Sequence, residues 1–377
     1  MFSKHDIQRN EMMLDGPFAR KGYDWWWHSF TGIDAKNGKE KQFFIEYFIC
    51  NPALGEKDPV FGQLPENQKK GRKPSYLMVK AGCWGENSVQ LHRFFGIKQT
   101  EIHAEAPFRI AAADCYVGES RLEGSITVTP EQAARHPEWM CDAGTMEWKL
   151  KVRKVIPFNV GYGASKPLQK LKAFEMYWHA EGMKSTYEGT VICNGRTYHV
   201  IPERSYGYAD KNWGSNFTSP WVWLSSCNMT SLLTGRKLND SVFDIGGGKP
   251  KIYCFPLERK LLSAFYYEGK HYEYNFSKFW TGTKTRFTVR ETPEAVYWHV
   301  RQENKTSVMD TRVRCLKKDM IFVNYESPDG KKLHNRLWNG GNGVGRIRLY
   351  KKRPGGMELI DDIRAENVGC EYGEYDA

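Results

Sequence analysis

The sequence of 377 residues lacks an uninterrupted apolar run of the roughly 18 residues that a membrane-spanning helix needs. Its first residues, Met1 to Asp6, contain no apolar core of a signal peptide. With 40% hydrophobic and 26% charged residues, the composition is typical of a folded, water-soluble chain. We therefore expect a cytoplasmic protein.

Cysteine is present, but never as a C-x-x-C pair. The nine cysteines are scattered singly, at positions 50, 83, 115, 141, 193, 227, 254, 315 and 370. An odd and dispersed set indicates buried thiols in a reducing compartment rather than a disulfide framework or a zinc site.

The motifs of several common enzyme classes are also absent. The sequence contains no His-Glu-x-x-His, no Gly-x-Ser-x-Gly and no Walker loop. The glycine-rich run from Gly340 to Gly345 lacks the spacing of a dinucleotide site and precedes a strand pattern, so we expect a tight turn there. The sequence thus predicts no metal site and no bound cofactor.

The net charge of +11 is compatible with several anionic partners. Lysine and arginine are nevertheless spread along the chain, and the only tight clusters are Lys69 to Lys73 and Lys351 to Arg353. Such clusters are typical of solvated loops and strand ends. We therefore expect no nucleic-acid partner, whereas a peripheral contact with an anionic membrane stays open, as does the oligomeric state.

Most of the chain has the pattern of β-strands. Short apolar and β-branched runs recur, separated by Gly, Asn, Asp and Pro. Helix signals are few: Thr129 as N-cap before Pro130 predicts one short helix, and apolar residues within 168–174 have helical spacing. The sequence therefore predicts an all-β fold of barrels or sandwiches.

A chain of this length is long enough for two domains. Gly, Pro and Ser concentrate between Phe158 and Pro167, which predicts domains of residues 1–160 and 161–377. The second half also repeats the first faintly, because Trp25-x-Trp27-x-Ser recurs as Trp221-x-Trp223-x-Ser.

An acid stands within an aromatic strand in the first half. The run from Gln42 to Cys50 predicts a buried strand in which Phe44, Glu46 and Phe48 share one face. A carboxylate in such surroundings must be paired or must have its pKa raised by desolvation. A structural ion pair with Lys or Arg and a role in a cavity are both open.

The stretch from Tyr206 to Trp223 combines many aromatic rings with one acid and one base. Asp210 lies between Tyr208 and Lys211, with further rings at positions 213, 217, 221 and 223. Aromatic faces beside a carboxyl and an ammonium suit a site that holds an apolar molecule and transfers a proton to it. The same residue types also form ordinary β cores and turns.

The stretch Tyr206-Gly-Tyr208-Ala-Asp210-Lys-Asn-Trp213-Gly, with Phe217 and Trp221-Val-Trp223, resembles the signature of the tocopherol cyclase family. Similar landmarks are Tyr177 to Met183 and Trp338 to Gly341, and in the first half Trp25 to Trp27, Phe44 to Phe48 and Ala81 to Gly85. Tyr208-x-Asp210 is also similar to the Tyr-x-Asp of carotenoid hydratases in the related superfamily. The resemblance implies two lipocalin-like β domains.

Members of that family close a ring by protonating an isoprenoid double bond, without a redox cofactor. The resemblance therefore implies a cyclase, hydratase or isomerase for a lipophilic isoprenoid or aromatic molecule. The site that it implies has Asp210 as the acid with Tyr208 beside it, and His179 and Glu46 to tune or relay protons. Around the substrate it places Trp25, Trp27, Trp178, Trp213, Trp223 and Lys211.

Two alternatives stay open. If Lys211 pairs with Asp210, the ammonium lowers the pKa of the carboxyl, which then suits a base and an isomerisation. Successive residues on a strand point to opposite faces, so this pairing is not required. A non-catalytic protein that binds a hydrophobic molecule between two barrels would use the same aromatic residues.

Overall fold

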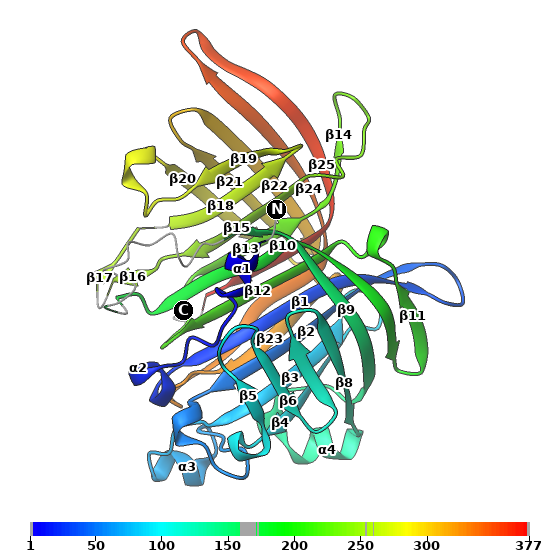
Figure 1. The fold of residues 1–377 in the computed structure, drawn as a ribbon, viewed down its shortest axis with the longest axis vertical. Helices are drawn as coiled ribbons and strands as arrows, with labels where there is room; N and C mark the ends of the chain where they lie inside the picture. The colour runs from blue at the N-terminus through cyan, green and yellow to red at the C-terminus, as the bar shows by residue number, and fades with distance from the viewer. Residues whose placement is uncertain (1–2, 159–170, 172, 253–254, 259, 375–377) are drawn as a thin grey trace. The chain divides into compact units, whose positions relative to one another are not determined.

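The computed structural model describes residues 3–158, 171, 173–252, 255–258 and 260–374. It is all-β with a few short helices, which confirms the predicted fold class (Figure 1). No helix among the described residues is long and apolar enough to cross a bilayer. The α-helices are α1 (Lys4–Ile7), α2 (Gly16–Arg20), α3 (Pro65–Lys69) and α4 (Pro130–Arg135), and the 3-10 helices are η1 (Pro52–Leu54), η2 (Ile97–Gln99), η3 (Pro137–Trp139), η5 (Pro202–Arg204), η6 (Phe279–Thr281) and η7 (Lys317–Asp319).

The single helix that the sequence predicts with both a cap and a proline is present. In α4 the Thr129 side chain accepts a hydrogen bond from the backbone N–H of Gln132, and Pro130 occupies the first helical position. The helical spacing within 168–174 falls largely outside the described residues, and a strand begins at Met176.

The chain forms two compact units. Of the described residues, the first unit contains those within Met1–Asn159, Met176–Phe217 and Val323–Asn335, and the second contains the rest. These units do not follow the predicted division at residue 160, because the strands between Met176 and Gly214 pair with strands of the first half. Whether residues 1–160 and 161–377 form separate domains stays a prediction.

The first unit is built on a twelve-stranded antiparallel sheet in the order β4-β3-β2-β1-β11-β10-β9-β8-β7-β6-β5, with β12 paired to both β1 and β10. The sheet curls so that β4 meets β8, where Nη1 of Arg93 donates to the carbonyl of Ser125 at 2.9 Å. The strands are β1 (Tyr23–Asp34), β2 (Glu40–Cys50), β3 (Tyr76–Cys83), β4 (Val89–Phe95), β5 (Glu101–His103), β6 (Arg109–Ala112), β7 (Cys115–Gly118), β8 (Arg121–Val128), β9 (Gly144–Phe158), β10 (Met176–Cys193), β11 (Arg196–Val200) and β12 (Gly207–Gly214).

The alternation of side chains along β1 defines two faces of this sheet. The Trp26 face points into the barrel, where the Trp26 ring stacks on Phe108 at 4.2 Å and the Tyr47 hydroxyl reaches the carbonyl of Glu123. The Trp27 face is the opposite side, with Trp25 and Trp27. Both faces are buried at β1, which explains why β1 is apolar along most of its length.

The second unit contains most of an eleven-stranded antiparallel sheet in the order β19-β18-β15-β13-β25-β24-β22-β21-β20, with β14 on β25 and β23 on β24. Its core includes Phe265, Trp298 and Ile347. The strands are β13 (Trp221–Ser226), β14 (Asn228–Ser231), β15 (Val242–Gly248), β18 (Lys260–Tyr267), β19 (Lys270–Tyr274), β20 (Lys284–Glu291), β21 (Ala295–Glu303), β22 (Ser307–Leu316), β23 (Met320–Glu326), β24 (Leu333–Arg353) and β25 (Gly356–Gly373), beside a small pair of β16 (Lys251–Ile252) and β17 (Phe255–Pro256).

Candidate functional site

One row of side chains crosses five neighbouring strands on the Trp27 face. In this row Asp210 of β12 faces Trp27, Trp27 faces Glu46 of β2, Glu46 faces Lys80 of β3, and Lys80 faces His92 of β4. Residues that oppose each other on antiparallel strands point to the same side of the sheet. The Trp27 face therefore carries an acid, an indole, an acid, an ammonium and an imidazole in sequence, all buried.

Asp210 stands at one end of the row and accepts two hydrogen bonds. The indole Nε1 of Trp178 donates to Oδ2 of Asp210 at 2.8 Å, and the Tyr208 hydroxyl donates to the same oxygen at 3.1 Å. Tyr208 reaches it because residues two apart on a strand share a face, and Trp178 reaches it from β10. With both donors on Oδ2, a proton bound to this carboxyl lies on Oδ1.

Glu46 and Lys80 form a fully buried ion pair next in the row. Nζ of Lys80 lies 2.8 Å from Oε2 of Glu46, and the Tyr325 hydroxyl donates to the same oxygen at 3.2 Å. The ammonium also lies 3.7 Å from the centroid of the Tyr325 ring. Burial raises the pKa of Glu46 while Lys80 and Tyr325 oppose the rise, and Oε1 of Glu46 has no hydrogen-bond partner among the described residues.

His92 closes the row as a neutral imidazole. Its Nδ1 lies 2.6 Å from the carbonyl oxygen of Trp139, which only accepts, so Nδ1 carries the proton. Burial and the nearby Lys80 ammonium hold the pKa of His92 well below its usual value. Nε2 is therefore a buried lone pair, and within the described chain no donor reaches it.

Aromatic rings surround this polar row. Trp25 stacks on Tyr325 at 5.3 Å and on Tyr23 at 5.4 Å, while Trp27 stacks on Phe44 at 5.2 Å. Phe217 extends the Trp25 stack at 5.8 Å. The carboxyl groups of the row thus lie in apolar surroundings, where ionisation costs more than in water.

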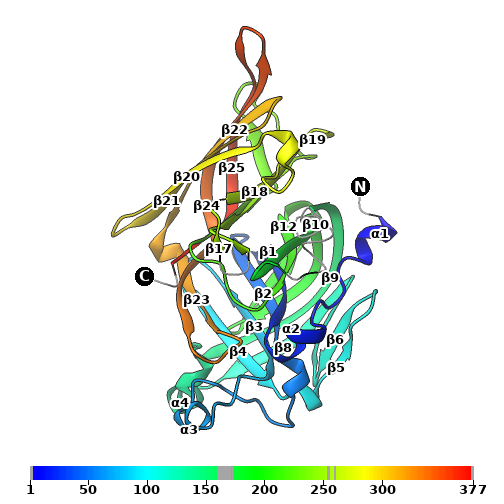
Figure 2. The same cartoon turned by 90° about the vertical axis from the view of Figure 1, so that its left-hand side faces the viewer.

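Residues 323–335, which include the end of β23, reach the Trp27 face from the far end of the chain, where the Tyr325 hydroxyl bonds Glu46 of β2 (Figures 1 and 2). Glu326 fixes this segment, since its Oε1 accepts from the backbone N–H of Gln63 at 2.6 Å and its Oε2 accepts from the Tyr76 hydroxyl at 3.5 Å. Nδ2 of Asn51 adds a bond to the carbonyl of Pro328 at 2.7 Å. Burial raises the pKa of Glu326 to about 8.

This shift predicts how stability depends on pH. Because the folded chain holds the Glu326 proton up to about pH 8 and the unfolded chain loses it near pH 4.5, the free energy of unfolding should fall between these values as pH rises. Relative to Glu326→Gln, the wild type should lose about 1.4 kcal/mol per pH unit in this window. Urea unfolding of both proteins at pH 5, 6, 7 and 8 measures it, and parallel profiles would contradict the assignment.

The comparisons with known proteins bear on the Asp210 end of this row. A family model described as tocopherol cyclase-like matches residues 103–374, which is more than half of the chain. The chain belongs to the tocopherol cyclase-like family. Among the site residues, the match includes Trp178, Tyr208 and Asp210, whereas the residues on β1 to β4 lie before it.

Three solved structures are similar to this family member across most of its length. An AttH-like protein from Nitrosomonas europaea is 12% identical with a TM-score of 0.42, covering 93% of this chain and 92% of its own. Kievitone hydratase from Nectria haematococca is 10% identical with a TM-score of 0.45, and the match covers 100% of this chain and 94% of its own. CghA with Sch210972 is 11% identical with a TM-score of 0.42, and the match covers 95% of this chain and 90% of its own. No curated protein matches.

The structure brings together six of the residues that the sequence proposes for the site. They share the Trp27 face and are Asp210, Tyr208, Glu46, Trp25, Trp27 and Trp178. Trp223 lies instead in the second unit, where its Nε1 donates to Oδ1 of Asp244 at 3.1 Å.

Lys211, His179 and Trp213 lie on the Trp26 face and not with Asp210. Nζ of Lys211 pairs with Asp24 at 2.9 Å, so its neighbour in the sequence is not its ion-pair partner. His179 contacts Oδ1 of Asn10 through Nε2 at 3.0 Å, and burial holds its pKa well below the usual value. These placements are corrections, and strand alternation is their reason. Positions 211 and 213 are an odd number of residues from 210, and 179 is one residue from 178, so their side chains point to the opposite face of the sheet.

Two residues of the row, Lys80 and His92, and one residue that contacts it, Tyr325, escaped the sequence analysis. Lys80 has a local signal, because it is the only charge in the run from Ser75 to Trp84. His92 has a weaker one, in a strand that also contains an arginine. Tyr325 has none, since it reaches Glu46 from 279 residues away.

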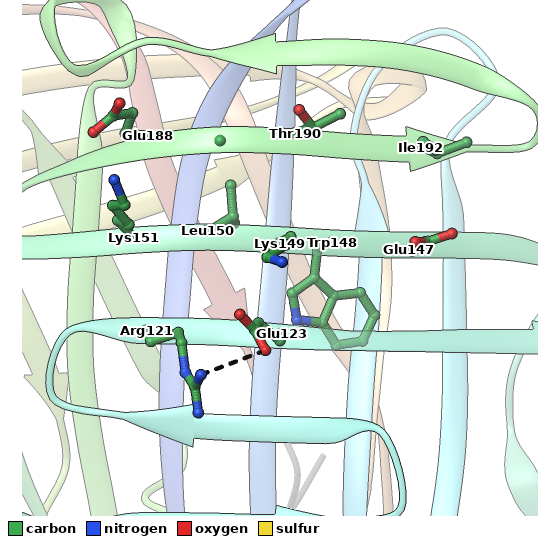
Figure 3. Close-up of a pocket in the computed structure, with 11 residues that line it drawn as sticks. Arg121, Glu123, Glu147, Trp148, Lys149, Leu150, Lys151, Glu188, Thr190 and Ile192 are labelled. Carbon is green, nitrogen blue, oxygen red and sulfur yellow. Dashed lines mark ion pairs between the residues drawn. The ribbon is translucent and has the colours of Figure 1, made fainter.

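A separate depression of about 490 Å³ lies on the exposed face of β8, β9 and β10 (Figure 3). Its lining carries charges of both signs, as where Lys151 faces Arg121 on one side and Glu188 on the other. The pair drawn there, Arg121 and Glu123, is 3.8 Å apart. No member of the buried row lines this depression, and exposed charges of both signs are typical of a solvated sheet face. Among the described residues, no group of three His, Cys, Asp or Glu side chains lies close enough to hold a metal ion.

Proposed function

We propose that this member of the tocopherol cyclase-like family is an acid/base enzyme that needs no redox cofactor. It cyclises, hydrates or isomerises a lipophilic isoprenoid or aromatic molecule on the Trp27 face. The observation that carries the proposal is the buried Asp210 carboxyl, held by Trp178 and Tyr208 among aromatic rings. Family membership supports a reaction of the cyclase or hydratase type.

Asp210 supplies the proton in this proposal. Its Oδ2 is fixed by two neutral donors, so the acidic proton lies on Oδ1 at a constant orientation. The apolar surroundings favour the neutral carboxyl, and Lys211, its neighbour in the sequence, pairs with Asp24 on the opposite face. This arrangement supports the acid over the base. The rings of Trp25 and Trp27 stabilise a carbocation formed by protonation of a double bond.

Residues farther along the row supply a base. When a phenol or water oxygen captures the cation, that oxygen must lose a proton. Oε1 of Glu46 and Nε2 of His92 are buried acceptors without a donor among the described residues. Glu46 lies two strands from Asp210, roughly 10 Å at the usual strand spacing. One molecule with a double bond near one end and a hydroxyl near the other would span this distance.

Mass spectrometry of a hydrophobic extract tests the proposal. The extract is incubated with the wild type and with Asp210→Asn, and the species consumed by the wild type alone are followed. A product of identical mass indicates cyclisation or isomerisation, and a product heavier by one water indicates hydration.

A non-catalytic binding protein is the alternative that this experiment separates. The aromatic face would serve it equally well. If the same compound co-purifies unchanged with both proteins after long incubation, the acid/base proposal is wrong and the binding function replaces it.

A further inference from the structure

Arginines are concentrated on one exposed sheet face of the second unit. Three rows of residues cross β20, β21, β22, β24 and β25 on this side, and those strands lie next to one another in Figure 1. We call it the arginine face. Its rows are Arg286-Arg301-Asp310-Arg348-Asp362, Thr288-His299-Arg312-Arg346-Arg364 and Arg290-Tyr297-Arg314-Val344.

The two aspartates of these rows do not neutralise the eight arginines. Asp362 is shared by Arg346, which binds it through two nitrogens at 2.6 Å, and by Arg348 at 3.2 Å. Asp310 is shared by Arg301 at 3.4 Å and Arg312 at 3.7 Å, and also by His299. Arg364 pairs in addition with Glu366 at 2.9 Å, so three carboxylates oppose eight arginines and a positive excess remains on the face.

The arginine side chains are more exposed than the two aspartates that pair with them. The side chains of Arg312, Arg346 and Arg364 are 66%, 53% and 60% exposed, whereas that of Asp362 is 9% exposed. These three arginines are direct cross-strand neighbours, an arrangement in which like charges repel. Binding of a polyanion would relieve this repulsion.

Exposed aliphatic side chains border the arginines. Met357 and Leu359, 53% and 40% exposed, stand on β25, and Nη2 of Arg301 approaches Sδ of Met357 at 3.8 Å. A loop with Leu232 and Leu233, 49% and 57% exposed, is joined to β25 by the bond from the backbone N–H of Leu232 to the carbonyl of Asp362. The basic run from Lys351 to Arg353 ends β24 at the hairpin that joins it to β25, just before Met357 in the sequence.

We propose that the arginine face docks on an anionic lipid bilayer. Guanidinium groups bind lipid phosphates and carboxylates in bidentate fashion, and the bordering aliphatic side chains enter the boundary between headgroups and acyl chains. A nucleic acid fits less well, since stacking platforms need several aromatic faces. Apart from the imidazole of His299, the three rows hold one aromatic ring, that of Tyr297, and Arg290 lies 4.8 Å from its centroid.

Vesicle co-sedimentation of the full chain tests this docking. The vesicles are phosphatidylcholine alone or phosphatidylcholine with about 30% phosphatidylserine. The wild type should bind only the anionic vesicles, and added salt should weaken the binding. The triple variant Arg286→Gln/Arg312→Gln/Arg364→Gln should bind on the order of 100-fold more weakly, since each arginine near an anionic surface contributes about five-fold.

A second triple variant distinguishes an effect of the arginine face on vesicle binding from an effect of the overall net charge. Arg109, Arg135 and Arg153 are exposed arginines of the first unit, and replacing all three with Gln removes the same charge elsewhere. This control should bind as the wild type does, and unchanged thermal unfolding of both variants shows that they fold. Equal losses in the two variants, absence of vesicle binding, or arginine-dependent binding of a single-stranded oligonucleotide in place of vesicles would each overturn the proposal.

Discussion

Asp210→Asn is expected to lower turnover by about 10²- to 10⁴-fold, the usual contribution of a positioned general acid. The amide keeps the shape of the carboxyl and an oxygen for the Trp178 and Tyr208 donors, but it cannot deliver a proton. KM should change little, because the protein surface proposed to bind the substrate is mostly aromatic and keeps its rings in this variant. The rate of product formation on the compound that mass spectrometry identifies measures the effect.

Variants of the two donors measure how much each hydrogen bond to Asp210 contributes to turnover. Tyr208→Phe and Trp178→Phe each remove one hydrogen bond to Oδ2 and leave the acid, so each should cost about ten-fold in turnover, equivalent to about 1.4 kcal/mol. Asp34→Asn is the matched control, because Asp34 is a buried aspartate of β1 that pairs with Arg196 away from the row. Full activity of Asp210→Asn would refute the assignment of the acid.

Periodicity along single strands predicted the all-β fold and the burial of Glu46, whereas Asp210 and Trp27 were proposed from the family resemblance. Strand alternation is local, so a run such as Gln42 to Cys50 reveals both its burial and the side of Glu46. The same rule applied to β12 separates Asp210 from Lys211, and the structure follows it. The family signature grouped 208 to 213 as one site without regard to alternation, and in the structure Lys211 and Trp213 lie on the Trp26 face.

What the sequence did not predict depends on contacts between distant segments. The partners of Glu46 are Lys80 on the next strand and Tyr325 from β23, and no local pattern pairs them. The assignment of 323–335 to the first unit has the same origin, since it depends on bonds such as that from Gln63 to Glu326. Registers between strands, unlike periodicity within one, are set by the whole fold.

Lys80→Met is expected to lower the free energy of unfolding by about 3–5 kcal/mol at pH 7, since it leaves the Glu46 carboxylate buried without its cation. The loss should shrink as pH falls. The pKa of Glu46 is already raised by burial in the folded chain, and it rises further without Lys80, so the folded variant takes up a proton that the unfolded chain does not hold above its own pKa. Urea unfolding followed by tryptophan fluorescence at several pH values measures both effects.

The double variant Glu46→Gln/Lys80→Met decides whether the pair stabilises the fold or serves the site. Removing both charges should restore most of the lost stability, because a buried ion pair is worth little compared with neutral groups of similar size. Strongly non-additive effects of the two single changes would show the direct coupling that a distance of 2.8 Å requires. If the double variant is as stable as the wild type yet fails to turn over the identified substrate, the pair is retained for proton transfer and not for folding. Additive losses would contradict the pairing itself.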